Sequence, residues 1–114
     1  MGKKSREKGK RGEREAAGVL SHLLGIPISR GVQYKGTKDS PDLSGLDAHG
    51  LHPEVKRDES TVSKKMYAAI SQAQEESDNS TPFVMSRRNG SEWLITIRVE
   101  DLLEFARKIN EIRT

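Results

Sequence analysis

Apolar residues recur at helical spacing in three stretches of the sequence, and this pattern most limits how the chain can fold. Such spacing places the apolar side chains on one face of an amphipathic helix. The three stripes are Ala16, Leu20, Leu23 and Leu24; Met66, Ala69, Ile70 and Ala73; and Leu102, Phe105, Ile109 and Ile112. Gly25 and Pro27 are expected to end the first helix, and Ser63 is the expected N-cap of the second. The pattern therefore predicts three helices.

The segments between these stripes are short and bounded by turn residues, which is typical of β-strands. Five strands are expected, over residues 28–34, 41–46, 51–57, 82–88 and 92–98. Ala48-His49-Gly50 is expected to turn the second strand into the third. Asn89-Gly90 predicts a type I′ turn between the last two strands, because both central residues of that turn need positive φ. Trp93, Ile95 and Ile97 alternate along the last strand and are expected in the core.

The order of these elements is helix, three strands, helix, two strands, helix, which predicts an α/β fold with helices covering a mixed sheet. The 114 residues are 32% hydrophobic and 32% charged, so one domain with a small core is expected. The absence of cysteine and of a glycine-rich phosphate loop argues against thiolate metal sites and nucleotide hydrolysis. No apolar run reaches the roughly 18 residues that span a membrane, and a cytoplasmic protein is expected.

Positive charge is concentrated at the N-terminus. Residues 1–14 hold seven basic and two acidic side chains, a net charge of +5, which leaves −2 for the rest of a chain whose total is +3. We expect residues 1–9 to form a flexible basic arm and residues 10–114 a single domain. The arm could bind several phosphates of a nucleic acid, or it could be a solubilising tail.

The stretch Pro53-Glu54-Val55-Lys56-Arg57 combines a carboxylate and an amine within one expected strand. Because successive strand side chains point to opposite faces, Glu54 and Lys56 share one face, about 6.6 Å apart along the strand, and Val55 faces the other way. A solvated strand face would show the same pattern. A functional interpretation of this stretch therefore requires that other parts of the chain place further functional side chains near Glu54 and Lys56.

Acidic residues in other parts of the chain are candidate partners of Glu54. If the second and third strands form a hairpin, Asp42 can lie beside Glu54, although Asp39 and Asp47 are rivals within reach. Converging carboxylates repel one another unless a cation lies between them, and oxygen ligands without cysteine favour Mg²⁺ or Mn²⁺. Glu13 falls on the buried stripe of the first helix, although favourable interaction with the helix dipole would also explain an acid in a first turn.

Taken together, these residues resemble the PD-(D/E)XK nuclease superfamily, and most closely its Holliday junction resolvase branch with the small phage-encoded relatives. The matching residues are the stretch KGKRGERE from Lys8 to Glu15, Arg30, Pro41-Asp42 and Glu54-Val55-Lys56. The resemblance covers about residues 8 to 88. It implies a restriction-endonuclease-like αβββαβ core with a mixed sheet, followed by a C-terminal strand and helix. The stretch after Lys56 is shorter and more acidic than in a full resolvase.

The resemblance further implies a Mg²⁺- or Mn²⁺-dependent DNA endonuclease, acting as a homodimer on branched or junction DNA in the cytoplasm of a bacterium or a phage-infected cell. Asp42 and Glu54 would be metal ligands, Glu13 would complete or support the metal site, and Lys56 would lie beside the nucleophilic water. Gln72 would be a further catalytic residue on the second helix, or simply a surface residue. The candidate DNA contacts are Lys8, Lys10, Arg11, Arg14, Arg30, Lys35, Lys38, Arg57, Arg87 and Arg88.

Other interpretations of the sequence remain open. The protein could be a nucleic-acid-binding protein that keeps the nuclease fold without catalysis, or an interaction module whose acidic loop recruits a partner. His49 and His52 have zinc-like spacing, but they lie at a turn without a third nitrogen ligand, so we expect ordinary loop histidines. Binding of a divalent metal near Asp42 and Glu54 would distinguish the enzyme from the other two classes.

Overall fold

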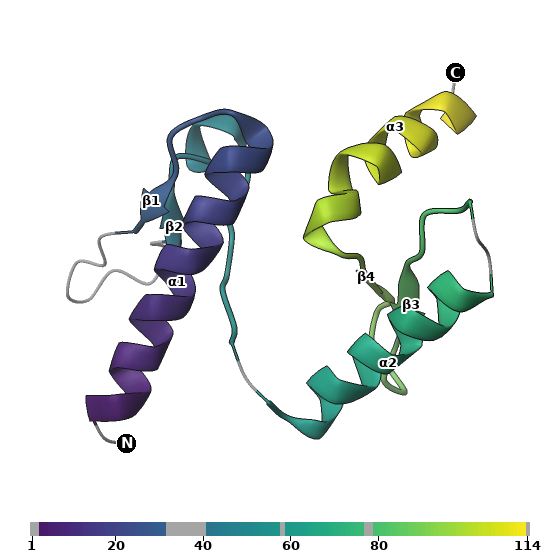
Figure 1. Cartoon of the computed structure of the whole chain (residues 1–114), viewed down its shortest axis with the longest axis horizontal. Coiled ribbons are helices and arrows are strands. Elements are labelled where there is room, and N and C mark those ends of the chain that lie inside the picture. Colours follow the sequence, from purple (N-terminus) through teal and green to yellow (C-terminus); the bar gives the residue numbers. More distant parts are fainter. Residues whose placement is uncertain (1–2, 32–40, 58, 77–78, 114) are drawn as a thin grey trace. The chain divides into compact units, whose positions relative to one another are not determined.

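The computed structural model describes residues 3–31, 41–57, 59–76 and 79–113 (Figure 1). The chain divides into two compact units, Met1–Asp58 and Glu59–Thr114, and each is described by itself. The expected single domain over residues 10–114 stays a prediction.

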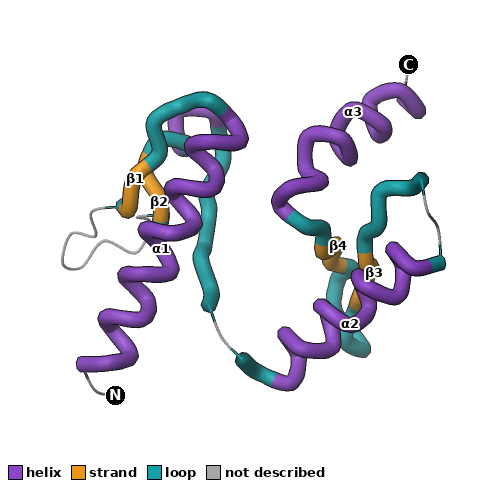
Figure 2. Tube along the Cα trace, in the orientation of Figure 1, coloured by secondary structure: helices purple, strands orange, loops and turns teal. Residues whose placement is uncertain are grey.

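The described residues form a mixed α/β structure with three helices and two small antiparallel sheets (Figure 2). The first unit holds α1 (Lys3–Leu24), β1 (Ser29–Arg30), β2 (Leu43–Ser44) and the 3₁₀ turn η1 (Asp47–His49). The second unit holds α2 (Thr61–Glu75), β3 (Val84–Ser86), β4 (Leu94–Thr96), the 3₁₀ turn η2 (Val99–Asp101) and α3 (Leu102–Arg113). The strands thus pair as two separate antiparallel hairpins, where one mixed sheet was expected.

Helix α1 starts earlier than the sequence pattern predicts. It begins at Lys3, so most of the expected arm is continuous with the helix. Lysine, arginine and glutamate favour helices, and a glycine such as Gly9 or Gly12 costs only about 1 kcal/mol relative to alanine. The helix ends as expected, because Gly25 has a positive φ of 71° and donates its N–H to the Ser21 carbonyl at 2.9 Å.

The core of the first unit lies between α1 and the β1–β2 hairpin, which Figure 1 shows beside the helix. Leu43 is completely buried in it. The other buried members are Ala17, Ile28 and Leu46. The backbone makes two close approaches here: a Cβ on Gly31 would lie 2.3 Å from the Pro41 oxygen, and a Cβ on Gly45 would lie 2.4 Å from the Pro27 oxygen. Only glycine fits at either position.

Replacing Gly45 by alanine is expected to destabilise the protein by about 2–4 kcal/mol. The new methyl group would clash with the Pro27 carbonyl, and the φ of +120° is one that side chains rarely adopt. Urea unfolding followed by circular dichroism measures the loss. Gly18→Ala is the matched control, because Gly18 lies in open space on α1 and alanine there should stabilise the helix by up to about 1 kcal/mol. Equal stability of the Gly45→Ala protein and the parent would contradict this packing.

In the second unit, α2 packs against β3. The hydroxyl of Thr96 on β4 lies 3.9 Å from the Met66 sulfur of α2, so this face of the hairpin is turned towards the helix. Phe83, just before β3, packs edge-to-face on Phe105 of α3, with ring centres 5.4 Å apart. The expectation that Trp93 and Ile95 are core residues is wrong for this structure: they lie on the opposite face from Thr96 and are 59% and 51% exposed.

The turn between β3 and β4 also differs from expectation. Ser91 donates its N–H to the Arg88 carbonyl at 3.0 Å, which closes a turn with Asn89 and Gly90 at its centre. Of the two central residues, only Gly90 has a positive φ, at 77°, so the turn is not type I′. One positive-φ residue in the second central position is the pattern of a type II turn.

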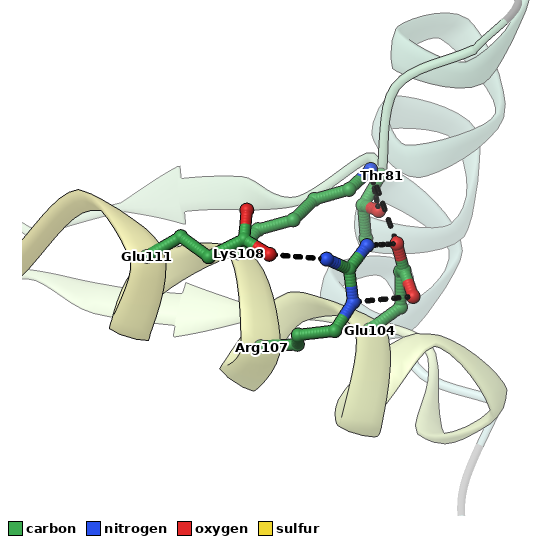
Figure 3. Close-up of polar contacts among 5 residues, drawn as sticks. All are labelled: Thr81, Glu104, Arg107, Lys108 and Glu111. Atoms are coloured by element: carbon green, nitrogen blue, oxygen red, sulfur yellow. Dashed lines mark hydrogen bonds and ion pairs between the residues drawn. The ribbon is translucent and has the colours of Figure 1, made fainter. Parts of the chain in front are cut away.

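Charged side chains on α3 form a local network with the segment before β3 (Figure 3). Arg107 pairs with Glu104 and Glu111, and Lys108 donates to the Thr81 hydroxyl at 2.9 Å. The hydrogen bond from Arg107, together with the charges of Arg107 and Lys108, holds the pKa of Glu104 below its usual range. Because the pKa of Glu104 is lower in the folded state, the stabilisation from its ion pairs is present above the unfolded-state pKa. It is lost as the pH falls through the lowered folded-state pKa.

Candidate functional site

Asp42 lies between β1 and the segment 53–57. Its carbonyl accepts the Gly31 N–H at 2.8 Å, and its own N–H donates to the Pro53 carbonyl at 3.1 Å. Its carboxylate oxygen Oδ2 accepts the Val55 N–H at 2.7 Å. The side chain of Asp42 thus contacts the backbone at the centre of the Glu54-Val55-Lys56 motif.

The segment carrying that motif alternates as expected but is not a strand. Val55 is half-buried and packs against the core, whereas Glu54 and Lys56 are exposed. Residues 51–57 lie outside the strands (Figure 2), so the prediction of a third strand is wrong. The physical reason is local: Pro53 has no N–H, and the Val55 N–H binds the Asp42 side chain where a ladder would need a backbone carbonyl.

Glu54 stands at the edge of this site. Its side chain is 59% exposed, and its Oε1 lies 3.5 Å from Nε2 of His52. His52 is thus a neighbour of a proposed metal ligand, while His49 lies exposed in η1.

Glu13 faces inward from the middle of α1. Its side chain is 14% exposed, and its Oε2 lies 3.6 Å from Nε of Arg30 on β1. Both atoms are buried and neither makes a hydrogen bond. Because α1 begins at Lys3, Glu13 is not in the first turn, and interaction with the helix dipole does not explain it. The arrangement leaves a buried carboxylate oxygen whose hydrogen-bonding capacity is unused.

The donor chemistry of Glu13, Asp42 and Glu54 suits a hard divalent cation, and the buried Glu13 oxygen that makes no hydrogen bond fits such a role. Within the described ranges, however, no three histidine or acidic side chains gather closely enough to hold a metal ion. Of the rival acids, Asp47 accepts the Gly45 N–H at 3.2 Å within its own turn, and Asp39 falls outside the described residues.

Gln72 lies on α2, in the second unit. Its exposed amide donates to Oε1 of Glu76 at 3.0 Å, one helical turn further along. The contact described for Gln72 is therefore local to its helix, and its predicted catalytic role stays a prediction.

The basic residues proposed for DNA binding lie in several parts of the chain. Arg30 lies on β1, where its Nε is buried beside Glu13. Lys8, Lys10, Arg11 and Arg14 lie on α1, with Arg11 and Arg14 exposed. Arg57 is exposed and its aliphatic stem lies against Gly12, where a Cβ would be 3.2 Å from the Arg57 Cβ, so Arg57 is held beside α1. Arg87 and Arg88 are exposed at the β3–β4 turn. Lys35 and Lys38 fall outside the described residues.

One residue of chemical interest was missed by the sequence interpretation. Trp93, assigned to the core by its alternation with Ile95, is exposed and lies under the Arg87 guanidinium. The observed register, in which Ser86 pairs with Leu94, brings the two residues opposite each other. The two-residue turn predicted at Asn89-Gly90 would have set Arg87 opposite Glu92, so no sequence signal indicated the pair.

Comparison with known proteins finds no matching family model, no similar curated protein and no similar solved structure. None of the helices in the described part of the chain is both long and apolar enough to cross a membrane.

Proposed function

We propose that the protein is a small metal-dependent DNA endonuclease with a site of the PD-(D/E)XK type. The observation that carries the proposal is the 2.7 Å hydrogen bond from the Val55 N–H to the Asp42 carboxylate. This bond joins the aspartate to the backbone of the Glu54-x-Lys56 motif, which supports the nuclease interpretation. The restriction-endonuclease-like core belongs to the same proposal.

The residues of this chain would divide the chemistry among them. Asp42 and Glu54 would hold the metal, with Glu13 completing or supporting its site from α1. A bound Mg²⁺ or Mn²⁺ lowers the pKa of a coordinated water and offsets the charge that develops on the phosphate. Lys56 would add a positive charge on the same exposed side as Glu54, close to where negative charge appears in the transition state.

DNA binding would use exposed basic residues of the first unit. Exposed Arg11 and Arg14 on α1 supply positive charge, as does Arg57, which directly follows the Glu54-x-Lys56 motif and lies against Gly12 of the same helix. Such contacts with phosphates provide salt-dependent affinity without reading base sequence. Selectivity for branched or junction DNA, by a homodimer, is the finer form of the proposal and follows the resemblance alone. A cytoplasmic location belongs to the same proposal.

A nucleic-acid-binding protein without catalysis is the second candidate. It is favoured by the protein contacts that two of the carboxylates already make: Glu54 with His52 and Glu13 with Arg30. Carboxylates that only stabilise the fold would show the same contacts.

A cleavage assay separates the two candidates. Branched, flapped, duplex and single-stranded DNA of matched length are incubated with the protein in Mg²⁺, in Mn²⁺ and in chelator. We expect cleavage of at least one substrate with either metal and none with chelator. Binding without cleavage of any substrate would favour the second candidate.

A further inference from the structure

Exposed positive charge and an exposed aromatic ring come together at the end of the β3–β4 hairpin. The guanidinium carbon of Arg87 lies 5.3 Å from the ring centre of Trp93, within the range of a cation–π contact. Arg88 is the next residue towards the turn and is exposed as well. Residues 87–93 contain these two arginines and one acidic residue, Glu92, so the segment has a net charge of +1.

The hairpin register explains why these side chains meet. Met85 is opposite Ile95 and Ser86 is opposite Leu94, so the same register continued by one position sets Arg87 opposite Trp93. Because side chains alternate, Arg87 and Trp93 share the face of Met85 and Ile95. That face is turned away from α2, which contacts Thr96 on the other side. The indole is therefore presented to solvent by the fold of its own unit.

A purely structural role accounts poorly for this arrangement. Tryptophan usually contributes to stability by burying a large apolar surface, yet 59% of Trp93 is exposed. An exposed cation–π pair adds only a small stabilisation. Positive side chains next to an exposed aromatic ring match what a phosphate backbone and its bases require.

We propose that Trp93, Arg87 and Arg88 form a contact site for single-stranded DNA. An unpaired base would stack on the indole ring, with the Arg87 guanidinium moving from over the ring to bind, together with Arg88, the adjacent phosphates. Every base has a flat π-face, so the site would favour unpaired over paired DNA without selecting a base sequence. The inference deepens the proposed function by naming unpaired bases as part of the substrate. It rests on DNA binding and not on cleavage.

The chain has a single tryptophan, so its fluorescence reports directly on this position. The full chain is titrated in EDTA with a thymidine oligonucleotide and, separately, with a duplex of equal length. We expect strong quenching by the single strand and weak quenching by the duplex. Two results would overturn the proposal. One is unchanged fluorescence at concentrations where the anisotropy of a labelled oligonucleotide shows that binding is saturated. The other is quenching that increases with protein concentration in the absence of DNA, which would assign this face to contact with a second copy of the chain.

Variants test the site independently of the fluorescence signal. Trp93→Ala should weaken single-strand binding by about 5- to 100-fold, the usual value of one stacked base, while Trp93→Phe should retain most of the affinity. Tyr67→Ala is the matched control, because Tyr67 is an aromatic residue of the same unit that is 73% exposed, and its loss should leave binding unchanged. Equal losses in Trp93→Ala and Tyr67→Ala, with both proteins folded by circular dichroism, would contradict the proposal. Since the assay contains no metal, a failure of cleavage would leave its result intact.

Discussion

Asp42→Asn is expected to lower Mg²⁺-dependent cleavage by about three orders of magnitude or more, because a catalytic metal contributes several kcal/mol to transition-state stabilisation. The substitution removes the negative charge, but the amide oxygen can still accept the Val55 N–H that Asp42 binds at 2.7 Å. The fold should therefore survive. Single-turnover cleavage at saturating DNA measures the loss, and thermal unfolding checks the fold.

Asp47→Asn is the control for this substitution. The Asp47 carboxylate accepts the N–H of Gly45 within its own turn. The Asp47→Asn protein should therefore cleave DNA at close to the parent rate. If both variants lose activity alike, or if neither does, Asp42 is not the metal ligand. Asp42→Ala is less informative, since loss of the acceptor for the Val55 N–H is expected to cost about 1 kcal/mol or more of stability.

Lys56→Ala is expected to reduce the rate of cleavage by about 100- to 1000-fold while changing DNA affinity little. The amine would act on charge that appears in the transition state and is absent from bound substrate. Rate constants from single-turnover cleavage and dissociation constants in chelator separate the two effects.

The adjacent Arg57 provides the comparison for Lys56. It is also exposed and basic, and it lies against Gly12 of α1, where we propose phosphate binding. Arg57→Ala should therefore weaken DNA binding and reduce its salt dependence by about one unit of slope, with turnover at saturating DNA preserved. Equal losses of affinity and rate in Lys56→Ala would make Lys56 an ordinary phosphate contact.

The helices were the part of the fold most readily predicted, because their apolar stripes extend over several turns. Their ends were less accurate. The second helix has Ser60 as its N-cap, three residues before the predicted Ser63, and the Ser60 hydroxyl accepts the Ser63 N–H at 3.2 Å. Both serines precede the same apolar stripe, so residue type alone could not choose between them.

The strands were harder to predict, because side-chain contacts outweigh local pattern in short segments. The strand expected over residues 28–34 is reduced to Ser29–Arg30 among the described residues. The alternation of residues 53–57 does place Val55 towards the core, but the Asp42 carboxylate takes its N–H and no ladder forms. The alternation of Trp93 and Ile95 correctly indicated that they share one face of the strand. The face that packs towards α2 is the opposite one, which carries Thr96, so the core was assigned to the wrong face.

The candidate site was predictable only where local sequence pattern determines the position of a side chain. The proximity of Asp42 to residue 55 follows from the expected pairing of their segments, and the inward position of Glu13 follows from the stripe of α1. The ion pair of Glu13 with Arg30 and that of Glu54 with His52 could not be foreseen, because they depend on how side chains from separate elements meet.

Binding of Mn²⁺ to the protein without DNA tests the central claim most directly. The electron paramagnetic resonance signal of free Mn²⁺ is recorded as metal is added to the parent, to Asp42→Asn, to Glu54→Gln and to Asp47→Asn. We expect the parent and Asp47→Asn to remove Mn²⁺ from solution, and the other two variants to bind it much more weakly. Binding by all four proteins alike, or by none of them at millimolar metal, would contradict a metal site at Asp42 and Glu54.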